Sequence, residues 1–597
     1  MAAVDRSTVD PQYTWDLSCM FESDKAFEEA LEAAKSYPEV FAAYQGKVGE
    51  NAADLLAFLK EDAACDICLS RLINYADRKS DEDTRVSKYQ DYSSQVRSLY
   101  VAIMSSYSWF TAEILATDPQ VLEGFYAQEP ELEQFRRSLD RVLRKRPHTL
   151  SPAEERLLAA AGDMANQPEN VFSLLNDADL TFPDAVDADG ETHALTHGSY
   201  IPLMNSADRT LRQSAFQNLY GMYGQFRNTF AATLASQTKQ LKFFADARKY
   251  DSTLAHALDA NEVPVEVYTN LISAVHQNMD AMYKYVDLRK RLLKVDELHF
   301  WDLYVPVIED VEMKFTYAEA CDIILQALQP LGEEYLGIVK QGLSQRWIDV
   351  YENPGKRSGA YSAGGYGMHP VILLNFQGTL DDVFTLIHEM GHSVHTYLSC
   401  QNQPSQYSDY VIFVAEVAST CNESLLMRWF LDHAEDDRQR AYLLNHFLEQ
   451  FRATLYRQTM FAEFELKANE LTAQGAGLTA DALCSIYRDL NKEYFGPGIC
   501  LDEEIALEWA RIPHFYYRYY VYQYATGFAA AIALSNRILT EGAPAVADYL
   551  GFLSGGCSKA PIDLLKGAGV DMSTTEPVES ALTLFSSLVD QLDDLLS

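Results

Sequence analysis

The stretch TLDDVFTLIHEMGHSVH, residues 379–395, decides how the functional part of this chain folds. It predicts an amphipathic helix, because its opening Thr and the Asp three residues later form a capping pair and apolar residues then recur at helical spacing. His388 and His392 are four residues apart, so their imidazoles lie one turn apart on nearly the same face. Two His residues in this pattern, with Glu389 between them, are typical of a zinc peptidase in which the Glu is the base. We therefore predict His388 and His392 as zinc ligands.

A five-residue pattern also occurs by chance, and the alternative is a surface His-Glu pair on an ordinary amphipathic helix. Gly391 argues against that alternative, since a glycine inside a helix costs about 1 kcal/mol relative to alanine. A purely structural helix has no reason to accept this cost. Catalytic zinc sites usually take three protein ligands, so a third must come from another element.

The next predicted helix, residues 413–423, offers a third ligand in Glu416. Glu416 shares a polar line with Ser419 and Glu423 on an otherwise apolar helix, where a carboxylate needs a partner such as a metal. The alternative is a surface Glu. His395 competes for the role, but two helical turns place it about 10.5 Å from the first His, too far to share one ion. We assign His395 to the surroundings of the metal, and Glu423 to the orientation of a ligand imidazole.

The composition is that of a large globular protein. With 597 residues the chain is longer than one core usually supports, so several subdomains are expected. Its formal net charge of −38 argues against nucleic acid and anionic membrane as partners. The charge is mildly compatible with cationic peptides, although a solvated acidic surface explains it as well.

Targeting and redox signals point to a cytoplasmic protein. Residues 1–18 have neither a basic leader nor an apolar core, and no apolar run approaches the ~18 residues that span a bilayer. The nine cysteines are odd in number and mostly isolated, which favours reduced thiols. Cys65 and Cys68 have a redox-like spacing but lack a strand-helix context, so we interpret them as two helical thiols.

Helical periodicity dominates the chain, and the predicted class is mostly α with a small β element next to the zinc helix. Residues 179–198 predict a hairpin with an Asp-Gly turn, with strands at 180–182 and 193–196. We expect an N-terminal helical lobe over 1–200 that ends in this hairpin, and a catalytic domain over 201–597. The longer helices are predicted at 24–45, 52–76, 80–118, 121–128, 131–145, 152–165, 206–246, 264–292, 316–346 and 576–596.

The segment 355–377 is the least helical part, with a glycine-rich loop and then a short strand at 371–376. Glycines remove side chains where another backbone could approach, so we predict that the loop binds substrate and that an extended peptide pairs with the edge of that strand. The alternative is an ordinary loop. The candidate substrate-binding residues are Gly364, Gly365, Tyr366, Gly367 and His369.

The segment 514–524, HFYYRYYVYQY, is a second unusual region. It holds more phenols than packing needs, and phenols with an imidazole could donate hydrogen bonds to an oxyanion. The alternative is a buried aromatic helix whose hydroxyls find local partners. Tyr519 and Tyr522 are three apart and could act together.

Several stretches together resemble one family nearly from end to end. They are YTWDLSCMFESD, RKYDSTLAHALDANEVPVEVY, LHFWDLYVPVI, GAYSAGGYG, ILLNFQGTLDDVFTLIHEMGHSVH, FVAEVAST, IPHFYYRYYVYQYATGF and SGGCSKAPIDLLKGAGVDM. The chain resembles the oligoendopeptidase F branch of the thimet-oligopeptidase-like zinc metallopeptidases. The resemblance implies an almost all-helical, two-lobed protein with a deep central channel that admits short unstructured peptides.

The resemblance also implies the roles of particular residues. Glu416 would be the third zinc ligand, and His514 with Tyr522 or Tyr519 would stabilise the transition state. The spacing of the tyrosines differs from that of the thimet branch. His369 lies where it would alter a substrate subsite.

The predicted function is therefore that of a zinc endopeptidase. One Zn²⁺ per chain and a Glu-activated zinc-bound water would hydrolyse internal peptide bonds of oligopeptides. The alternatives are an exopeptidase, which needs a charged group to capture a peptide terminus, and a peptide-binding protein without catalysis, which would not need Glu389. The sequence assigns no oligomeric state.

Overall fold

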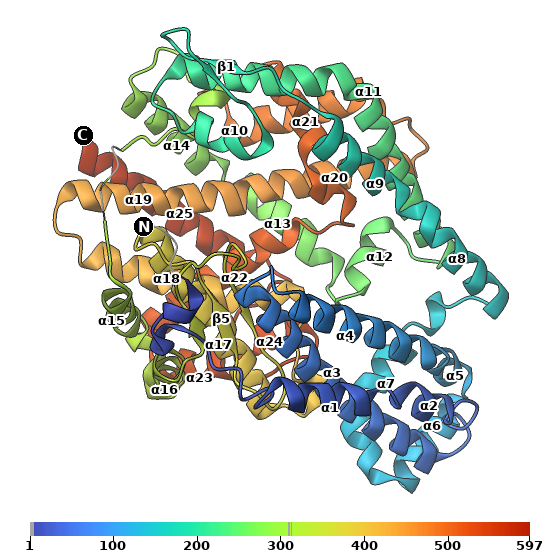
Figure 1. Cartoon of the computed structure of the whole chain (residues 1–597). Helices are drawn as coiled ribbons and strands as arrows, with labels where there is room; N and C mark the ends of the chain where they lie inside the picture. Colours follow the sequence, from blue (N-terminus) through green and yellow to red (C-terminus); the bar gives the residue numbers. More distant parts are fainter. Residues whose placement is uncertain (1–4, 309–310, 312) are drawn as a thin grey trace. The chain divides into compact units, whose positions relative to one another are not determined.

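The computed structural model describes residues 5–308, 311 and 313–597, and the chain is mostly helical with two small sheets (Figure 1). The predicted fold class is thereby confirmed. The chain forms two compact units, each from three separate segments. Unit 1 consists of residues 1–147, 313–429 and 534–569, and unit 2 of residues 148–312, 430–533 and 570–597. The division at residue 200 stays a prediction, because these units follow spatial contacts rather than sequence order.

Unit 1 contains the N-terminal helices, the larger sheet and the helix with the His-Glu-x-x-His pattern. Its elements are α1 (Asp24–Ala34), α2 (Tyr37–Ala42), α3 (Ala52–Glu82), α4 (Ser87–Ser106), α5 (Phe110–Ala116), α6 (Pro119–Gln128), α7 (Arg136–Leu143), α15 (Tyr317–Ala327), α16 (Gly332–Ser344), β3 (Ile348–Asp349), β4 (Tyr361–Ala363), β5 (Val371–Leu373), α17 (Leu380–Asn402), α23 (Ala543–Leu553) and α24 (Pro561–Gly567).

Unit 2 is built around the long helix α11. Its elements are α8 (Pro152–Ala165), α9 (Gln167–Ser173), β1 (Ala185–Val186), β2 (Thr192–His193), α10 (His197–Met204), α11 (Arg209–Ala247), α12 (Thr253–Asp259), α13 (Val265–Gln277), α14 (Met279–Leu293), α19 (Asp437–Gln450), α20 (Arg457–Ala473), α21 (Ala480–Phe495) and α25 (Glu576–Leu596). Two of the unit boundaries fall inside helices, in α18 (Ile412–Asp432) and in α22 (Tyr522–Glu541). Among the described residues, no helix is long and apolar enough to cross a lipid bilayer.

The larger sheet has three strands in the order β3-β5-β4. β5 is parallel to β3 and antiparallel to β4, with Ala363 opposite Val371. Val371 and Leu373 belong to the same buried core as Phe58 and Leu72 of α3, so this core fixes the sheet against the N-terminal helices. β4 is the edge strand on the side of α17, with which it is in contact.

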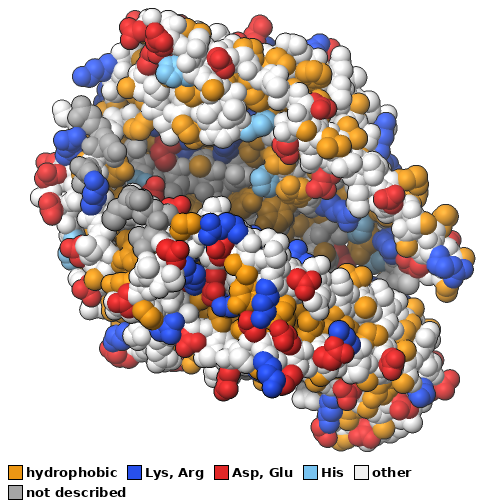
Figure 2. Space-filling model, viewed as in Figure 1, with side chains coloured by type: hydrophobic (Ala, Val, Ile, Leu, Met, Phe, Trp, Pro, Cys, Tyr) orange, Lys and Arg blue, Asp and Glu red, His pale blue; other side chains and the backbone are white. Residues whose placement is uncertain are grey.

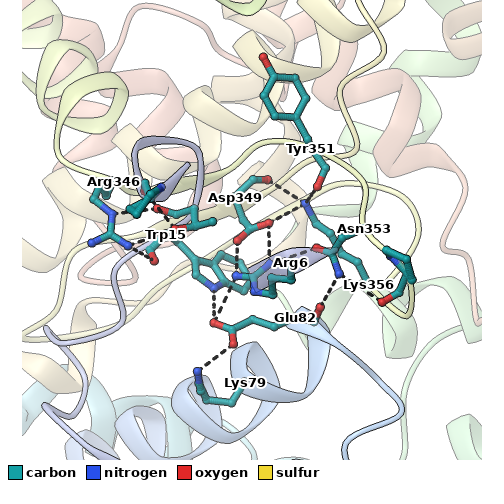
Figure 3. A network of polar contacts seen from close by, with 12 residues as sticks. Arg6, Trp15, Lys79, Glu82, Arg346, Asp349, Tyr351, Asn353 and Lys356 are labelled. Carbon is teal, nitrogen blue, oxygen red and sulfur yellow. Dashed lines mark hydrogen bonds and ion pairs between the residues drawn. The ribbon is translucent and has the colours of Figure 1, made fainter. Parts of the chain in front are cut away.

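A buried polar network braces β3 against the N-terminal segment (Figure 3). Arg6 donates to both carboxylate oxygens of Asp349, at 3.2 and 2.5 Å, and Lys356 Nζ lies 2.7 Å from the same carboxylate. The side chain of Asp349 is 2 % exposed, so its charge requires these two cations. Trp15 joins the network through Glu82 at the end of α3. The network therefore holds the segment with Arg6 and Trp15, α3 and β3 together within unit 1.

The predicted helices 80–118 and 264–292 are each divided at a break without proline, into α4 and α5 and into α13 and α14. Three other differences from the predicted elements trace to proline. The predicted helix 24–45 is divided into α1 and α2, and 316–346 into α15 and α16; Pro38 lies in the first turn of α2 and Pro330 in the turn before α16. Proline lacks the N–H that a continuous helix needs. The hairpin is confirmed, but its strands are β1 and β2 rather than 180–182 and 193–196. Pro183 follows the first predicted strand and cannot donate to a ladder.

Candidate metal centre

The helix α17 forms as its sequence predicts. Thr379 caps it, with its Oγ1 accepting from the N–H of Asp382 at 3.2 Å and the Asp382 carboxylate accepting from the N–H of Thr379 at 2.8 Å. The apolar stripe is fully buried, with Ile387, Met390 and Val394 all at 0 % exposure. Because this stripe faces the core, the two imidazoles project from the side of the helix toward α18.

Gly391 allows α18 to lie unusually close to α17. A β-carbon at this position would be 2.7 Å from Cα of Ser419 and 2.9 Å from the carbonyl oxygen of Ala418. Backbone cannot yield as a flexible side chain does, so any larger residue would push the two helices apart. Asn422 of α18 also donates to the carbonyl of Ile387 at 3.2 Å. The sequence indicated a special role for Gly391, because glycine is costly inside a helix. The structure shows that this role is to permit the close packing of α17 and α18.

Three donor atoms converge between these helices. His388 Nε2 and His392 Nε2 are 3.1 Å apart, and each lies 3.4 Å from Glu416 Oε2. Bonds of about 2.0–2.2 Å to a tetrahedral ion require donor separations of roughly 3.3–3.6 Å. Two imidazoles and a carboxylate also form a donor set that zinc accepts. The predicted ligands therefore fit a zinc ion by spacing and by chemistry.

Carboxylates and a hydroxyl orient these donors. Glu423 Oε1 is hydrogen-bonded to His388 Nδ1, which directs Nε2 of that ring toward Glu416. Ser419 Oγ donates to Glu416 Oε2 at 3.1 Å. Burial opposes a charge on His388, but the hydrogen bonds with Glu416 and Glu423 raise its pKa to about 10. Burial likewise opposes a charge on Glu416, yet the two imidazoles hold the pKa of its carboxyl well below the usual range.

Glu389 lies beside the same cluster and is 7 % exposed. Burial raises the pKa of its carboxyl, and the charge of Glu416 acts in the same direction. The imidazoles of His388 and His392 and the backbone N–H of Ser362 in β4 act in the opposite direction. A carboxyl with a raised pKa, next to positive charge and a strand edge, suits proton transfer. The sequence did not single out Ser362, because only the sheet brings it to α17.

His395 is separate from the three donors. Its side chain is 1 % exposed and stacks on Tyr410 with ring centroids 3.7 Å apart. Burial lowers the pKa of His395 to about 3, so the ring is neutral. Its Nδ1 has no hydrogen-bond partner within the described part of the chain. The structure thus brings His388, His392, Glu416 and Glu423 together and places His395 behind them.

An edge strand, β4, lies within the predicted glycine-rich loop, whereas the strand that follows the loop is β5. β5, the predicted peptide-pairing strand, is the central strand of its sheet, so the expectation of an available edge there is wrong. The available edge belongs to β4, which precedes Gly364. A β-carbon on Gly364 would lie 3.1 Å from Cα of Pro370, and one on Gly365 2.4 Å from Ser70 Oγ. Packing inside unit 1 therefore already accounts for these two glycines.

The other candidate substrate residues lie around the same loop. Tyr366 is half-buried and Gly367 is exposed with φ +76°, a backbone conformation that favours glycine. A β-carbon on Gly367 would be 3.5 Å from Arg71. His369 stacks on Trp347 with ring centroids 5.1 Å apart.

The aromatic segment of unit 2 is not one helix. Residues 513–516 form a short 3-10 turn, Arg518 and Tyr519 have left-handed backbones with φ of 55° and 59°, and α22 begins at Tyr522. Tyr519 and Tyr522 are each 2 % exposed, and the Tyr519 hydroxyl is 2.7 Å from Thr253 Oγ1. Their burial supports the structural alternative for both rings.

His514 has different neighbours. Its ring lies 6.2 Å from that of Tyr520, and its Nε2 is 3.4 Å from the hydroxyl of Tyr524. The positions of the tyrosines along 516–524 could not separate Tyr520 and Tyr524 from the buried pair, because helical spacing does not hold in this turn.

Comparison with known proteins agrees with this geometry. Residues 202–584 match the description "Peptidase family M3" and residues 113–182 match "Oligopeptidase F". The chain belongs to peptidase family M3. Oligopeptidase PepF of Bacillus subtilis is 46 % identical over 592 residues, which cover 99 % of this chain and 88 % of that protein. An oligoendopeptidase F homolog of Lactococcus lactis subsp. lactis is 39 % identical over 595 residues, 100 % of this chain and 99 % of that protein.

Solved structures show the same relationship for this M3 peptidase. The crystal structure of oligoendopeptidase F from Enterococcus faecium is 36 % identical with a TM-score of 0.75, covering 96 % of this chain and 99 % of that one. The crystal structure of a peptidase from Chlamydophila abortus is 36 % identical with a TM-score of 0.95, covering 99 % of this chain and 100 % of that one. The resemblance to the oligoendopeptidase F branch is confirmed, and the chain is a peptide hydrolase of the metallopeptidase class.

Proposed function

We propose that this M3 peptidase hydrolyses internal bonds of short, unstructured peptides with one Zn²⁺ held by His388, His392 and Glu416. The observation that carries the proposal is the convergence of these three donors with the carboxyl of Glu389 beside them. When bound, the ion would supply Lewis acidity, polarising a carbonyl and lowering the pKa of a water ligand.

The residues of the chain would do the remaining work. Glu389 would accept a proton from the attacking water at its carboxylate and then deliver it to the nitrogen of the leaving amine. Its raised pKa favours the first of these transfers, because the carboxylate is then a stronger base than an ordinary Glu. Glu423 would hold the His388 ring in the tautomer that presents Nε2.

The edge of β4 would orient the substrate. An extended peptide that pairs with Tyr361–Ala363 would be held by main-chain groups, next to the strand whose Ser362 N–H meets Glu389. Recognition through the main chain predicts broad side-chain tolerance. Gly367 and Tyr366 border this edge, and His369 would shape a neighbouring subsite.

A transition-state role for His514 with Tyr519 or Tyr522, which the family resemblance implies, also stays a proposal. The contacts of His514 favour Tyr520 and Tyr524 over the two buried tyrosines as its partners. Phenylalanine substitutions separate the possibilities, because they remove only the hydroxyl. Loss of kcat in Tyr520→Phe or Tyr524→Phe, with little change in Tyr522→Phe, would support the revised assignment.

The test of the main proposal is Glu389→Gln in full-length protein. We expect the metal content to match that of the parent while kcat falls by at least about 10²-fold, the scale of general-base catalysis. Near-normal turnover in a metal-replete variant would exclude this role for Glu389. Mass spectrometry of products from peptides blocked at both ends checks internal cleavage, since an exopeptidase would leave them intact. The central channel and a cytoplasmic location stay predictions.

A further inference from the structure

A second group of metal-ligating side chains lies in unit 2, outside the candidate active site. Glu297, His299 and Cys500 each present a donor atom, and the three atoms lie within 4.8 Å of one another. They come from two segments, one after α14 and one after α21, which the hydrogen bond from Cys500 N–H to the Leu298 carbonyl joins at 2.7 Å. The backbone thus brings the segments together independently of these side chains.

The imidazole of His299 is oriented like that of a metal ligand. Asp502 Oδ1 is 2.7 Å from His299 Nδ1, and Asp502 Oδ2 accepts the N–H of Phe300 at 3.0 Å. The ring also stacks on Trp301 with centroids 4.1 Å apart. Both contacts direct Nε2 toward Glu297, whose Oε2 is 4.0 Å away. A carboxylate on one ring nitrogen with the other nitrogen facing further donors is the usual surrounding of a metal-binding His, as Glu423 and His388 show in unit 1.

Simpler explanations account poorly for this convergence. A contact of 4.0 Å to a Glu that is 73 % exposed contributes little as an ion pair. A metal ion explains why a thiol, a carboxylate and an oriented imidazole meet.

A third cluster in unit 2 provides the contrast. His276 has Nε2 at 2.6 Å from Glu463 and Nδ1 at 2.9 Å from Glu493, so carboxylates engage both of its nitrogens. Lys467 adds a positive charge at 2.7 Å from Glu463. This cluster is complete as an ion-pair network, whereas the group around His299 leaves Nε2 directed at two further donors.

We propose that Glu297, His299 and Cys500 bind a second transition-metal ion, of the Zn²⁺ class. Sulfur, nitrogen and oxygen donors together suit Zn²⁺ better than Mg²⁺ or Ca²⁺, which take oxygen. Binding forms a metal–sulfur bond and releases the Cys500 thiol proton to solvent. The exposed side chain of Glu297 would rotate inward to bring the donors to the roughly 3.3–3.8 Å separations that such bonds require.

The ion would connect the two segments of unit 2. One begins where α14 ends at Leu293, and the other leads from α21 toward the turn that carries His514. A bound ion stabilises the folded state in proportion to its concentration over its dissociation constant. The site is therefore expected to stabilise unit 2 and to be separate from the chemistry in unit 1.

Cobalt(II) distinguishes the two centres in the intact protein, because only the second contains sulfur. Metal-stripped full-length protein is titrated with Co²⁺, and the near-ultraviolet thiolate-to-cobalt charge-transfer band is recorded. We expect a band whose final intensity corresponds to one thiolate-bound Co²⁺ per chain and which is complete once two equivalents of Co²⁺ are bound. It is expected to vanish in Cys500→Ser and to persist in Cys557→Ser, a control at a half-buried thiol of unit 1.

Further variants test the remaining ligands and the folding of the variants. Cys500→Ser is expected to bind one metal equivalent fewer than the parent, with an unchanged thermal midpoint when both are metal-free. Glu297→Gln is expected to keep the band with at least about tenfold weaker affinity, and Asp502→Asn to weaken affinity by about 10–100-fold. Absence of the band in the parent, or its persistence in Cys500→Ser, would overturn the proposal. So would equal metal content in the two proteins.

Discussion

At the scale of single residues, Gly391 determines whether α18 can bring Glu416 to the two imidazoles. The backbone of Ser419 would lie 2.7 Å from a β-carbon at this position. A single added methyl group at Gly391 would therefore change the geometry of the candidate metal centre by pushing the two helices apart. Glu416 reaches its place only because α17 has no side chain there.

Gly391→Ala is expected to weaken zinc binding and to lower kcat/KM, with a loss of stability of about 1–3 kcal/mol from overpacking. The control is Gly337→Ala in α16, where a β-carbon would meet nothing within 4 Å. That substitution should be neutral or stabilise by up to about 1 kcal/mol. Zinc affinity by competition with a chelator and thermal unfolding measure both effects. Parental zinc affinity in Gly391→Ala would contradict this account.

Glu465 of α20 is a residue whose buried carboxyl makes stability depend on pH. Its Oε1 accepts the N–H of Tyr519 at 2.6 Å, beside the two left-handed residues, and burial raises its pKa to about 8. In the unfolded chain the pKa is about 4.3. Between these values the folded state retains a proton that the unfolded state has lost, so stability falls as pH rises from about 4 to about 8.

Glu465→Gln is expected to remove this dependence, because the amide oxygen can still accept from Tyr519 and carries no titrating proton. Between about pH 5.5 and about pH 7.5 the parent should lose up to about 2–3 kcal/mol more than the variant. Thermal midpoints across this pH range measure the difference. Glu470→Gln, at an exposed position of the same helix, is the control and should follow the parent. Identical pH profiles for Glu465→Gln and the parent would show that Glu465 does not titrate in this way.

At the scale of elements, the position of β4 at the edge of its sheet leads to a prediction about substrates. β5 lies between β3 and β4, so only the outer strands can accept a peptide, and β4 is the outer strand in contact with α17. Peptides in which an ester replaces one backbone N–H near the cleaved bond lose one potential hydrogen bond. Each such loss should lower kcat/KM by up to about tenfold, the value of one hydrogen bond, whatever the side chains.

The ester series is compared in two peptides of unrelated side chains, with substitutions far from the cleaved bond as the control. Main-chain recognition requires the same positional pattern in both peptides. If the positions at which an ester lowers kcat/KM differ between the two peptides according to their side chains, pairing along β4 is excluded. A variant at Gly365 is a poor probe, because any side chain there collides with Ser70 and disturbs the packing on α3.

At the scale of the whole molecule, the net charge of −38 is the dominant property. On the face that Figure 2 shows, acidic and basic side chains are interspersed rather than gathered into one patch of a single sign. Excess negative charge that is spread in this way destabilises the folded state through general self-repulsion.

Added salt should therefore stabilise the protein. Raising NaCl from about 10 mM to about 150 mM shortens the screening length from about 30 Å to about 8 Å. We expect the thermal midpoint at neutral pH to rise by about 1–3 °C. KCl at equal ionic strength should act alike, which separates screening from ion-specific binding. A lower or unchanged midpoint would mean that self-repulsion is negligible in the folded state.

The sequence by itself determined the features that depend on neighbours along the chain. The cap at Thr379, the buried stripe of α17 and the pairing of His388 with His392 follow from helical spacing, which is a local property. The mostly helical class and the hairpin turn at Gly190 follow from periodicity and turn chemistry in the same way. The sequence also indicated Glu416 as a candidate third ligand, because a carboxylate on an otherwise apolar helix needs a partner.

Only the tertiary structure decided the features that depend on contacts between distant segments. The close approach at Gly391 brings Glu416 to the imidazoles, while the ring of His395 stacks on Tyr410 instead. Strand order made β4 the edge, and a left-handed turn separated Tyr519 from His514. Periodicity specifies which face of an element is buried, but it does not specify which element covers that face or how closely the two backbones approach.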